Sequence, residues 1–153
     1  ERLALSRHNM AVTLLSAHDL DDVVSIVLAV LRDELAADYA VIKLFSNDQE
    51  RIKQNPVLFI DANNEKLKAF KTMLEHKNTV CGKSTKEQKV LLFGDNADHI
   101  SSAAIIPLVA GANLGLIGLG SNSSSRFHSS MGTDFLSRTG ELVSASLATH
   151  LEQ

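Results

Sequence analysis

Ser101–Gly120 reads Ser-Ser-Ala-Ala-Ile-Ile-Pro-Leu-Val-Ala-Gly-Ala-Asn-Leu-Gly-Leu-Ile-Gly-Leu-Gly. Two apolar runs, partly β-branched, flank the turn-forming residues Gly111, Ala112 and Asn113, and this pattern predicts a β-hairpin. Both runs are apolar at consecutive positions and do not alternate with polar residues. We therefore expect both faces of the hairpin to be covered by other elements.

The segments next to the hairpin predict two helices and a further central strand. Downstream, the polar loop Ser121–Ser125 precedes a long amphipathic C-terminal helix. The apolar stripe of this helix consists of Leu136, Gly140, Val143, Leu147 and Leu151. Upstream, Asp19 is suited to cap a helix that continues to about Ala36. The run Tyr39–Phe45 that follows has apolar residues on both faces of a strand, which is typical of a central position.

The middle of the chain predicts shorter elements. Ser46–Asn55 has the composition of a polar turn, Val57–Ile60 that of a short strand, and Thr79–Lys83 that of a connection. Between the strand and the connection we expect a helix that follows Asn63 or Asn64 as its N-cap. The predicted buried stripe of this helix is Leu67, Phe70 and Leu74.

A short helix is predicted directly before the hairpin. Ser84 with Glu87 and Thr85 with Gln88 form two overlapping capping boxes, and Gly94 is suited to end the helix. Together these elements indicate an α+β fold: a central antiparallel sheet flanked by helices, with long N- and C-terminal helices.

The N-terminal segment 1–17 reads as a helix with Leu3, Met10 and Leu14 on one stripe and Arg7 interrupting it. This pattern fits the end of a coiled coil that enters a domain, and it also fits a helix packed on its own sheet. We divide the chain into this coiled-coil-like signalling helix and a domain over residues 18–153. If the stripe is exposed, it predicts a homodimer through the terminal helices.

The residues of the hairpin and last helix carry a resemblance to a known family. They are Ser101, Pro107-Leu108, Gly111, Leu114-Gly115-Leu116-Ile117, Phe127, Phe135-Leu136 and Leu142-Val143. In this pattern the chain resembles the closing hairpin and last helix of a GAF domain. The more detailed sequence pattern, including Met131-Gly132-Thr133-Asp134 before Phe135, resembles the proteobacterial GAF-like family known as domain of unknown function 484. The resemblance implies a GAF-like fold in a bacterial protein and no established activity.

Length and composition set broad limits on function. The 153 residues suit one domain, with 44% hydrophobic and 22% charged residues. The net charge of −3 gives no electrostatic reason to expect nucleic acid or an anionic membrane as a partner. The longest uncharged apolar run, Val23–Leu31, is shorter than the roughly 20 residues that span a bilayer. We expect a cytoplasmic protein, and because the chain begins at Glu1 within a helical pattern, we expect an N-terminal part to be missing.

No catalytic, metal or cofactor site is predicted, and we expect a protein that is not an enzyme. The six histidines show no i, i+4 pairing and no cysteine partner, so a metal site has little support. Cys81 is the single cysteine, and the residue after it is Gly82. GAF domains that attach a bilin typically have histidine there, and GAF-type methionine sulfoxide reductases need several cysteines. We therefore interpret Cys81 as a small buried apolar residue.

Lysines are concentrated in one segment. Seven of the nine lysines lie between Glu65 and Lys89, against three glutamates in the same stretch. In GAF domains this region forms the lid over the ligand pocket, so the segment fits an anionic ligand or acidic partner. A solvated helix face is the alternative interpretation.

A candidate ligand pocket follows from small residues in the hairpin. Gly118 and Gly120 remove side chains from one face of the second strand, and glycine within a strand indicates close approach of another group. That group is either a packed helix or a ligand. In the second case the candidate pocket consists of Phe59, Phe70 and Phe93 as apolar walls, Ser101 as a hydroxyl, Lys43 as a cation, and Ala104 and Gly118 as the small floor.

Two functions therefore remain open. The first is a GAF-like regulatory or sensory module that binds an unidentified small molecule, passes a signal through a helical dimer, or does both. The second is a ligand-free dimerisation or protein-interaction scaffold, in which the protein's own side chains fill the pocket.

Overall fold

The computed structural model describes the backbone of residues 2–128 and 133–151 and the side chains from His8 onwards within these ranges. Leu3, Met131 and Gly132, which the sequence analysis used, therefore lie outside the described side chains. The helices are α1 (Arg2–Leu14), α2 (Leu20–Leu35), α3 (Gln49–Gln54), η1 (Glu65–Phe70), α4 (Lys71–His76), α5 (Lys86–Phe93), η2 (Gly94–His99) and α6 (Asp134–Leu151), where η denotes a 3-10 helix. The strands are β1 (Tyr39–Ser46), β2 (Phe59–Asp61), β3 (Val80–Gly82), β4 (Ser102–Ala110) and β5 (Ala112–Ser121).

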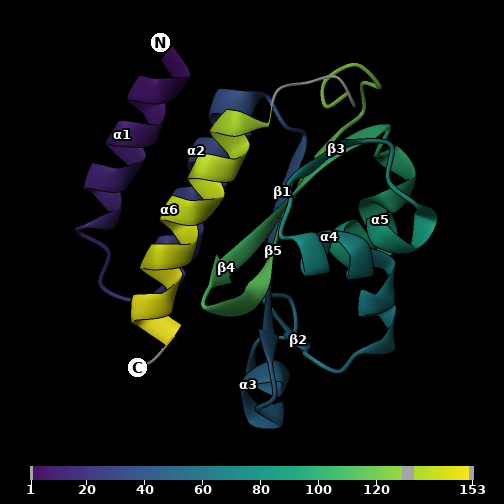
Figure 1. Ribbon diagram of the computed structural model, residues 1–153, viewed down its shortest axis with the longest axis horizontal. Coiled ribbons are helices and arrows are strands. Elements are labelled where there is room, and N and C mark those ends of the chain that lie inside the picture. Colours follow the sequence, from purple (N-terminus) through teal and green to yellow (C-terminus); the bar gives the residue numbers. More distant parts are fainter. Residues whose placement is uncertain (1, 129–132, 152–153) are drawn as a thin grey trace.

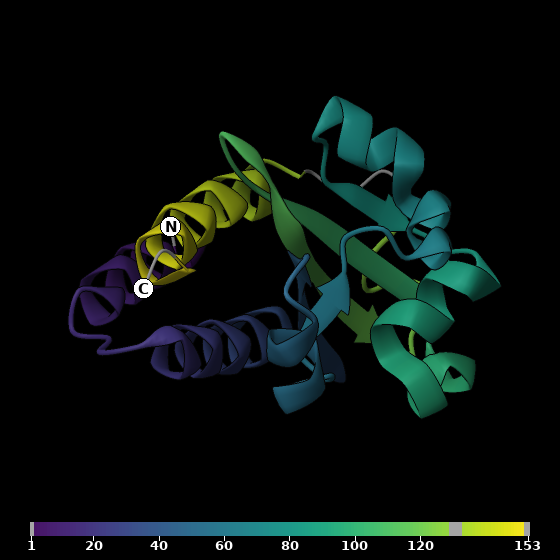
Figure 2. The same cartoon turned by 90° about the horizontal axis from the view of Figure 1, so that it is seen from below.

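The five strands form one sheet in the order β2-β1-β5-β4-β3, with the hairpin strands β5 and β4 inside it. Three of the strand pairs are antiparallel, whereas β1 and β2 run parallel, so the sheet is mixed. Helices α2 and α6 cover one face of the sheet, with α1 packed on their outer side, and η1, α4 and α5 lie on the other face (Figures 1 and 2). The predicted α+β class is confirmed, with the β1–β2 pair as the departure from an antiparallel sheet.

The hairpin is covered on both faces, as its sequence predicts. Its turn is tight, because β4 ends at Ala110 and β5 begins at Ala112, with Gly111 between them at φ +79°. Such a positive φ is accessible to glycine without steric cost. The β4–β5 register shifts between Leu108 and Val109, which marks a β-bulge.

Two separate apolar clusters lie on the two faces of the sheet. The cluster under α1, α2 and α6 includes Ala40, Ile42, Leu44, Ala104, Ile106, Ile117, Leu119, Val143 and Leu147. The cluster under α4 and α5 includes Phe70, Met73, Leu92, Phe93, Ile105 and Leu116, with Tyr39, Val41 and Phe45 packed against it. The alternation predicted for β1 is confirmed, because successive residues of this strand enter opposite clusters.

The N-terminal helix α1 packs on the same core as α2 and α6. Met10 and Leu14 are buried in the protein's own core, which favours the alternative of a helix that packs on its own domain. The physical reason is that the stripe faces the apolar sides of α2 and α6. Among the described side chains of this region, the large hydrophobic residues Val12 and Leu15 are exposed, with 54% and 88% of their surface accessible.

Three local predictions need correction. The polar turn over 46–55 contains helix α3, which buries no side chain and whose first N–H groups bond to the Asp48 carboxylate. The connection over 79–83 contains β3, a strand that is formed by pairing with β4. The strand expected at 57–60 is shifted to Phe59–Asp61, and Val57 is exposed.

The buried stripe of the 65–76 region also differs from the prediction. The single expected helix is divided into η1 and α4, and its fully buried residues are Phe70 and Met73, whereas Leu67 and Leu74 are half-buried. The change from a 3-10 to an α-helical turn at Phe70 rotates the following residues, so the stripe does not keep one period.

Candidate functional site

The space above Gly118 is filled by side chains of the protein. A Cβ atom on Gly118 would lie 3.0 Å from Leu92 Cδ1 and 3.1 Å from Val41 Cγ2. One on Gly120 would lie 2.5 Å from Ile100 Cδ1 and 3.1 Å from the Phe93 ring. The glycines therefore allow α5 and the segment before β4 to approach the sheet closely.

The seven residues predicted to form a pocket are not brought together. Phe70, Phe93 and Gly118 lie on the face with α4 and α5. Phe59 and Ala104 belong to the cluster on the opposite face. The guanidinium carbon of Arg51 lies 5.1 Å from the centre of the Phe59 ring, on this opposite face.

Lys43 and Ser101 are the two polar residues of the predicted pocket. Lys43 follows Val41 on the α5 side of β1 and is half-buried. Its Nζ donates a 2.7 Å hydrogen bond to the carbonyl oxygen of Val57, and burial lowers the pKa of this ammonium group. Ser101 is exposed immediately before β4.

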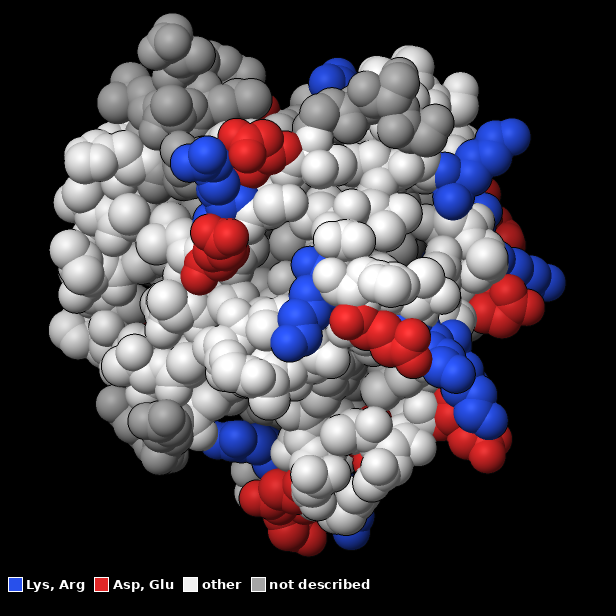
Figure 3. Space-filling model, in the orientation of Figure 1, with Lys and Arg blue, Asp and Glu red and all other residues white. Residues whose placement is uncertain are grey.

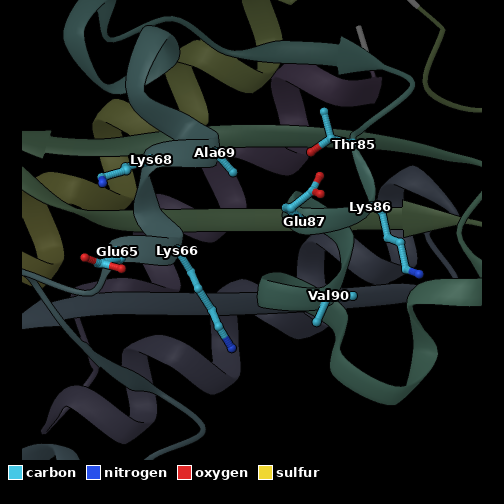
Figure 4. Close-up of a pocket in the computed structure, with 8 residues that line it drawn as sticks. All are labelled: Glu65, Lys66, Lys68, Ala69, Thr85, Lys86, Glu87 and Val90. Atoms are coloured by element: carbon cyan, nitrogen blue, oxygen red, sulfur yellow. The ribbon is translucent and has the colours of Figure 1, made fainter.

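A different concavity lies between η1 and the N-terminal part of α5. We call it the η1–α5 groove (Figure 4). It has a volume of about 670 Å³ and is lined by Glu65, Lys66, Lys68, Ala69, Thr85, Lys86, Glu87 and Val90. Three of the seven clustered lysines therefore line it, together with two of the three glutamates of that segment.

Local hydrogen bonds fix both walls of the groove. Asn64 caps η1, and its Oδ1 accepts from the Lys66 N–H at 2.9 Å. Of the two predicted capping boxes, the one formed by Thr85 and Gln88 is present at the start of α5. The Gln88 side chain also donates a 2.8 Å hydrogen bond to the Ala69 carbonyl oxygen, which joins the two walls. These hydrogen bonds fix the position of η1 relative to α5.

Charged and apolar groups are mixed in the groove. Lys66 extends from η1 towards the side of Val90, and the Glu87 carboxylate lies beside Thr85, while Lys68 and Lys86 point away from the gap (Figure 4). Acidic and basic side chains also alternate along this side of the molecular surface (Figure 3). Within the described part of the chain, Lys66 and Glu87 have no ion-pair partner within 4.0 Å.

These groups can hold a small molecule by complementary contacts. The Lys66 ammonium can donate hydrogen bonds to a carboxylate or phosphate, and the Glu87 carboxylate can accept them from an amine or hydroxyl. The side chains of Ala69 and Val90 offer apolar contact between them. Sequence reasoning drew attention to the lysines and the capping box but missed Ala69, Glu87 and Val90, because their proximity depends on how η1 packs beside α5.

Metal ligands, the single thiol and the helices give no further candidate site among the described residues. No group of three or more histidine, cysteine, aspartate and glutamate side chains that could hold a metal ion occurs among them. Cys81 is half-buried in the edge strand β3, and burial raises the pKa of its thiol. Over the same described ranges, none of the helices combines the length and apolar character needed to cross a bilayer.

Comparison with known proteins gives one result. A family model described as "Protein of unknown function, DUF484" matches residues 1–152, almost the whole chain. No curated protein matches the sequence.

Proposed function

We propose a non-catalytic regulatory function for this chain, which belongs to the DUF484 family, whose description assigns no function. In this proposal the protein binds a small molecule that carries an acidic group and an apolar part in the η1–α5 groove. The observation that carries the proposal is the combination of about 670 Å³ of space with lysine side chains and the apolar Ala69 and Val90.

The size and lining of the groove support this proposal. Small-molecule sites commonly have volumes of roughly 300–1,000 Å³ and combine apolar walls with a few polar anchors. Lys66 would anchor the acidic group of the ligand, because its ammonium group has no ion-pair partner among the described residues. Glu87 would select ligands that also carry a hydrogen-bond donor.

A GAF-like sensory mechanism is part of the same proposal. Helix α5 forms one wall of the groove, and its Leu92 rests on Gly118 of the hairpin. The opposite face of the hairpin is covered by α6, which packs beside α2. A ligand that moves α5 would therefore act on the sheet through Leu92, and the sheet would pass the change to the terminal helices.

Native mass spectrometry of freshly purified protein tests the ligand proposal. We expect a bound small molecule, released on denaturation, in the wild-type protein. Ala69→Phe should abolish this adduct, because the new ring fills the groove while the Ala69 carbonyl keeps its hydrogen bond from Gln88. Ala29→Phe, an equal change on the exposed side of α2, is the control and should keep the adduct. An adduct retained by Ala69→Phe would contradict the site.

The scaffold alternative is favoured by a separate observation. Val12 and Leu15 are exposed on and directly after α1, and such residues are suited to a homodimer contact. Light scattering at micromolar concentration tests this, with a dimer expected for the wild type and a 16.6 kDa species for Val12→Glu combined with Leu15→Glu. Val12 and Leu15 are the positions to substitute, because charges at the buried Met10 and Leu14 would unfold the core.

A further inference from the structure

A second pocket lies at the open end of the hairpin, where β4 begins and β5 has just ended. It has a volume of about 330 Å³ and is lined by two lysines, Lys83 and Lys89, the apolar Ile100, and four serines, Ser84, Ser101, Ser102 and Ser124. It shares none of these residues with the η1–α5 groove. No aspartate or glutamate is among the described residues that line it.

The serine loop after β5 is held in place by the protein itself. The buried Ser102 hydroxyl donates a 2.6 Å hydrogen bond to the Ser123 carbonyl oxygen and accepts one of 3.1 Å from the Phe127 N–H. On the far side of the loop, the Asp38 carboxylate accepts a 2.8 Å hydrogen bond from the Asn122 N–H. The position of Ser124 is thus set by bonds that need no ligand.

The remaining donors of the pocket have no strong partner. The hydroxyls of Ser84, Ser101 and Ser124 make no hydrogen bond among the described residues. Lys89 Nζ reaches only the Ile100 carbonyl oxygen, at a long 3.4 Å, and Lys83 has no ion-pair partner in the described part of the chain. Two positive charges and three hydroxyl groups therefore border one space without an anion.

We propose that this pocket binds phosphate, either as the free ion or as the phosphate group of a small molecule. A phosphate carries about two negative charges at neutral pH and several acceptor oxygens, which matches two ammonium groups and three hydroxyls. Lysine binds phosphate as a point charge and needs no fixed planar geometry, so the flexible Lys83 and Lys89 side chains suffice. The volume exceeds that of phosphate alone and leaves room for the group that the phosphate is attached to. This site is separate from the η1–α5 groove, and its test does not depend on whether the groove binds a ligand.

Thermal unfolding with added phosphate tests the proposal. With inorganic phosphate at about tenfold its dissociation constant, we expect the Tm to rise by roughly 3 °C above that in potassium chloride of equal ionic strength. Phenyl phosphate is the second probe. A larger rise with phenyl phosphate assigns the site to phosphomonoesters, and a rise with inorganic phosphate alone assigns it to the free ion, so both results support a phosphate site.

Lysine variants identify where the phosphate binds. Lys83→Gln combined with Lys89→Gln should abolish the rise. Lys53→Gln combined with Lys71→Gln removes the same charge outside the pocket and should keep it. Ser101→Asp, at an exposed position of the pocket wall, should also abolish the rise by charge repulsion without altering the core. The proposal is overturned if phosphate has no more effect than chloride, or if Ser101→Asp and both lysine pairs respond like the wild type.

Discussion

The backbone N–H of Val109 in β4 donates a 2.9 Å hydrogen bond to the hydroxyl of Ser144 in α6. Val109 lies where the β4–β5 register shifts, and the ladder of backbone hydrogen bonds is disrupted at such a bulge. The Ser144 hydroxyl in turn donates to the Gly140 carbonyl oxygen at 2.6 Å, and Ser144 is buried. Helix α6 therefore stabilises the irregular point of the hairpin through one side chain.

Ser144→Ala should lower the free energy of unfolding by about 1–3 kcal/mol, because it leaves the partly buried Val109 N–H without an acceptor. Urea denaturation at neutral pH measures the change. Ser146→Ala on the same helix is the control, since Ser146 is half-buried and makes no hydrogen bond through its hydroxyl among the described residues. Equal losses of unfolding free energy for both variants would show that the Val109–Ser144 hydrogen bond makes no specific contribution to stability.

Gly118→Leu should destabilise the protein by overpacking, since even a Cβ atom there would lie 3.0 Å from Leu92 Cδ1. Overpacking costs typically 1–3 kcal/mol, and Leu92→Ala alone should cost about 2–5 kcal/mol through the cavity it leaves. Combining the two substitutions should cost less than their sum, because the new leucine occupies the vacated space. Thermal unfolding of the three variants measures this. Additive losses would contradict direct packing of Leu92 on Gly118.

The hairpin and β1 could be predicted because their signals are local. Consecutive apolar residues on either side of Gly111 require that both faces of the hairpin are covered. In β1, successive residues point to opposite faces of the sheet, so the position of each residue in the strand gives its face. Helix α3 gives no apolar signal because it buries no side chain and depends on the Asp48 cap. Strand β3 is set by pairing with Ala103–Ile105, and a partner about 20 residues away in sequence is not visible in the strand's own three residues.

The candidate site was predictable only in part for the same reason. The lysine-rich segment and the Thr85–Gln88 capping box are sequence features, and both contribute to the η1–α5 groove. The face of Phe59 was not predictable, because it depends on the parallel register that places Phe59 opposite Leu44. Sequence alone also left open what fills the space above Gly118, and the answer, Leu92, depends on the tertiary position of α5.

The stability of the protein should respond to pH through Lys43. Burial lowers the pKa of Lys43 from its ordinary value of 10.5, so the folded state binds fewer protons than the unfolded state between the two pKa values. The cost of burying the charge is complete below the folded-state pKa and is relieved as the pH rises to 10.5. The free energy of unfolding of the wild type should therefore rise relative to that of Lys43→Met as the pH increases.

Paired urea denaturation series from neutral pH to 10.5 measure this difference. Lys53→Met, at an exposed position of α3, controls for loss of one charge and should run parallel to the wild type. A difference between wild type and Lys43→Met that stays constant over the whole range would contradict a lowered pKa.

Cys81 should react slowly with alkylating reagents and should not act as a nucleophile. Its thiol is half-buried in β3, and burial raises its pKa, so less of the reactive thiolate is present at neutral pH than in a free cysteine. The rate of iodoacetamide labelling, followed by mass spectrometry over a series of pH values, measures both accessibility and pKa. We expect labelling in the folded protein to be at least several-fold slower than in urea-unfolded protein, with the midpoint of the pH profile above the ordinary value of 9.0.

Val80→Ser, beside Cys81 on the exposed side of the edge strand, is the control for local opening and should leave the midpoint unchanged. Fast labelling with a midpoint below 9.0, or stoichiometric reduction of methionine sulfoxide by the protein, would instead identify an activated thiol and contradict the non-catalytic assignment.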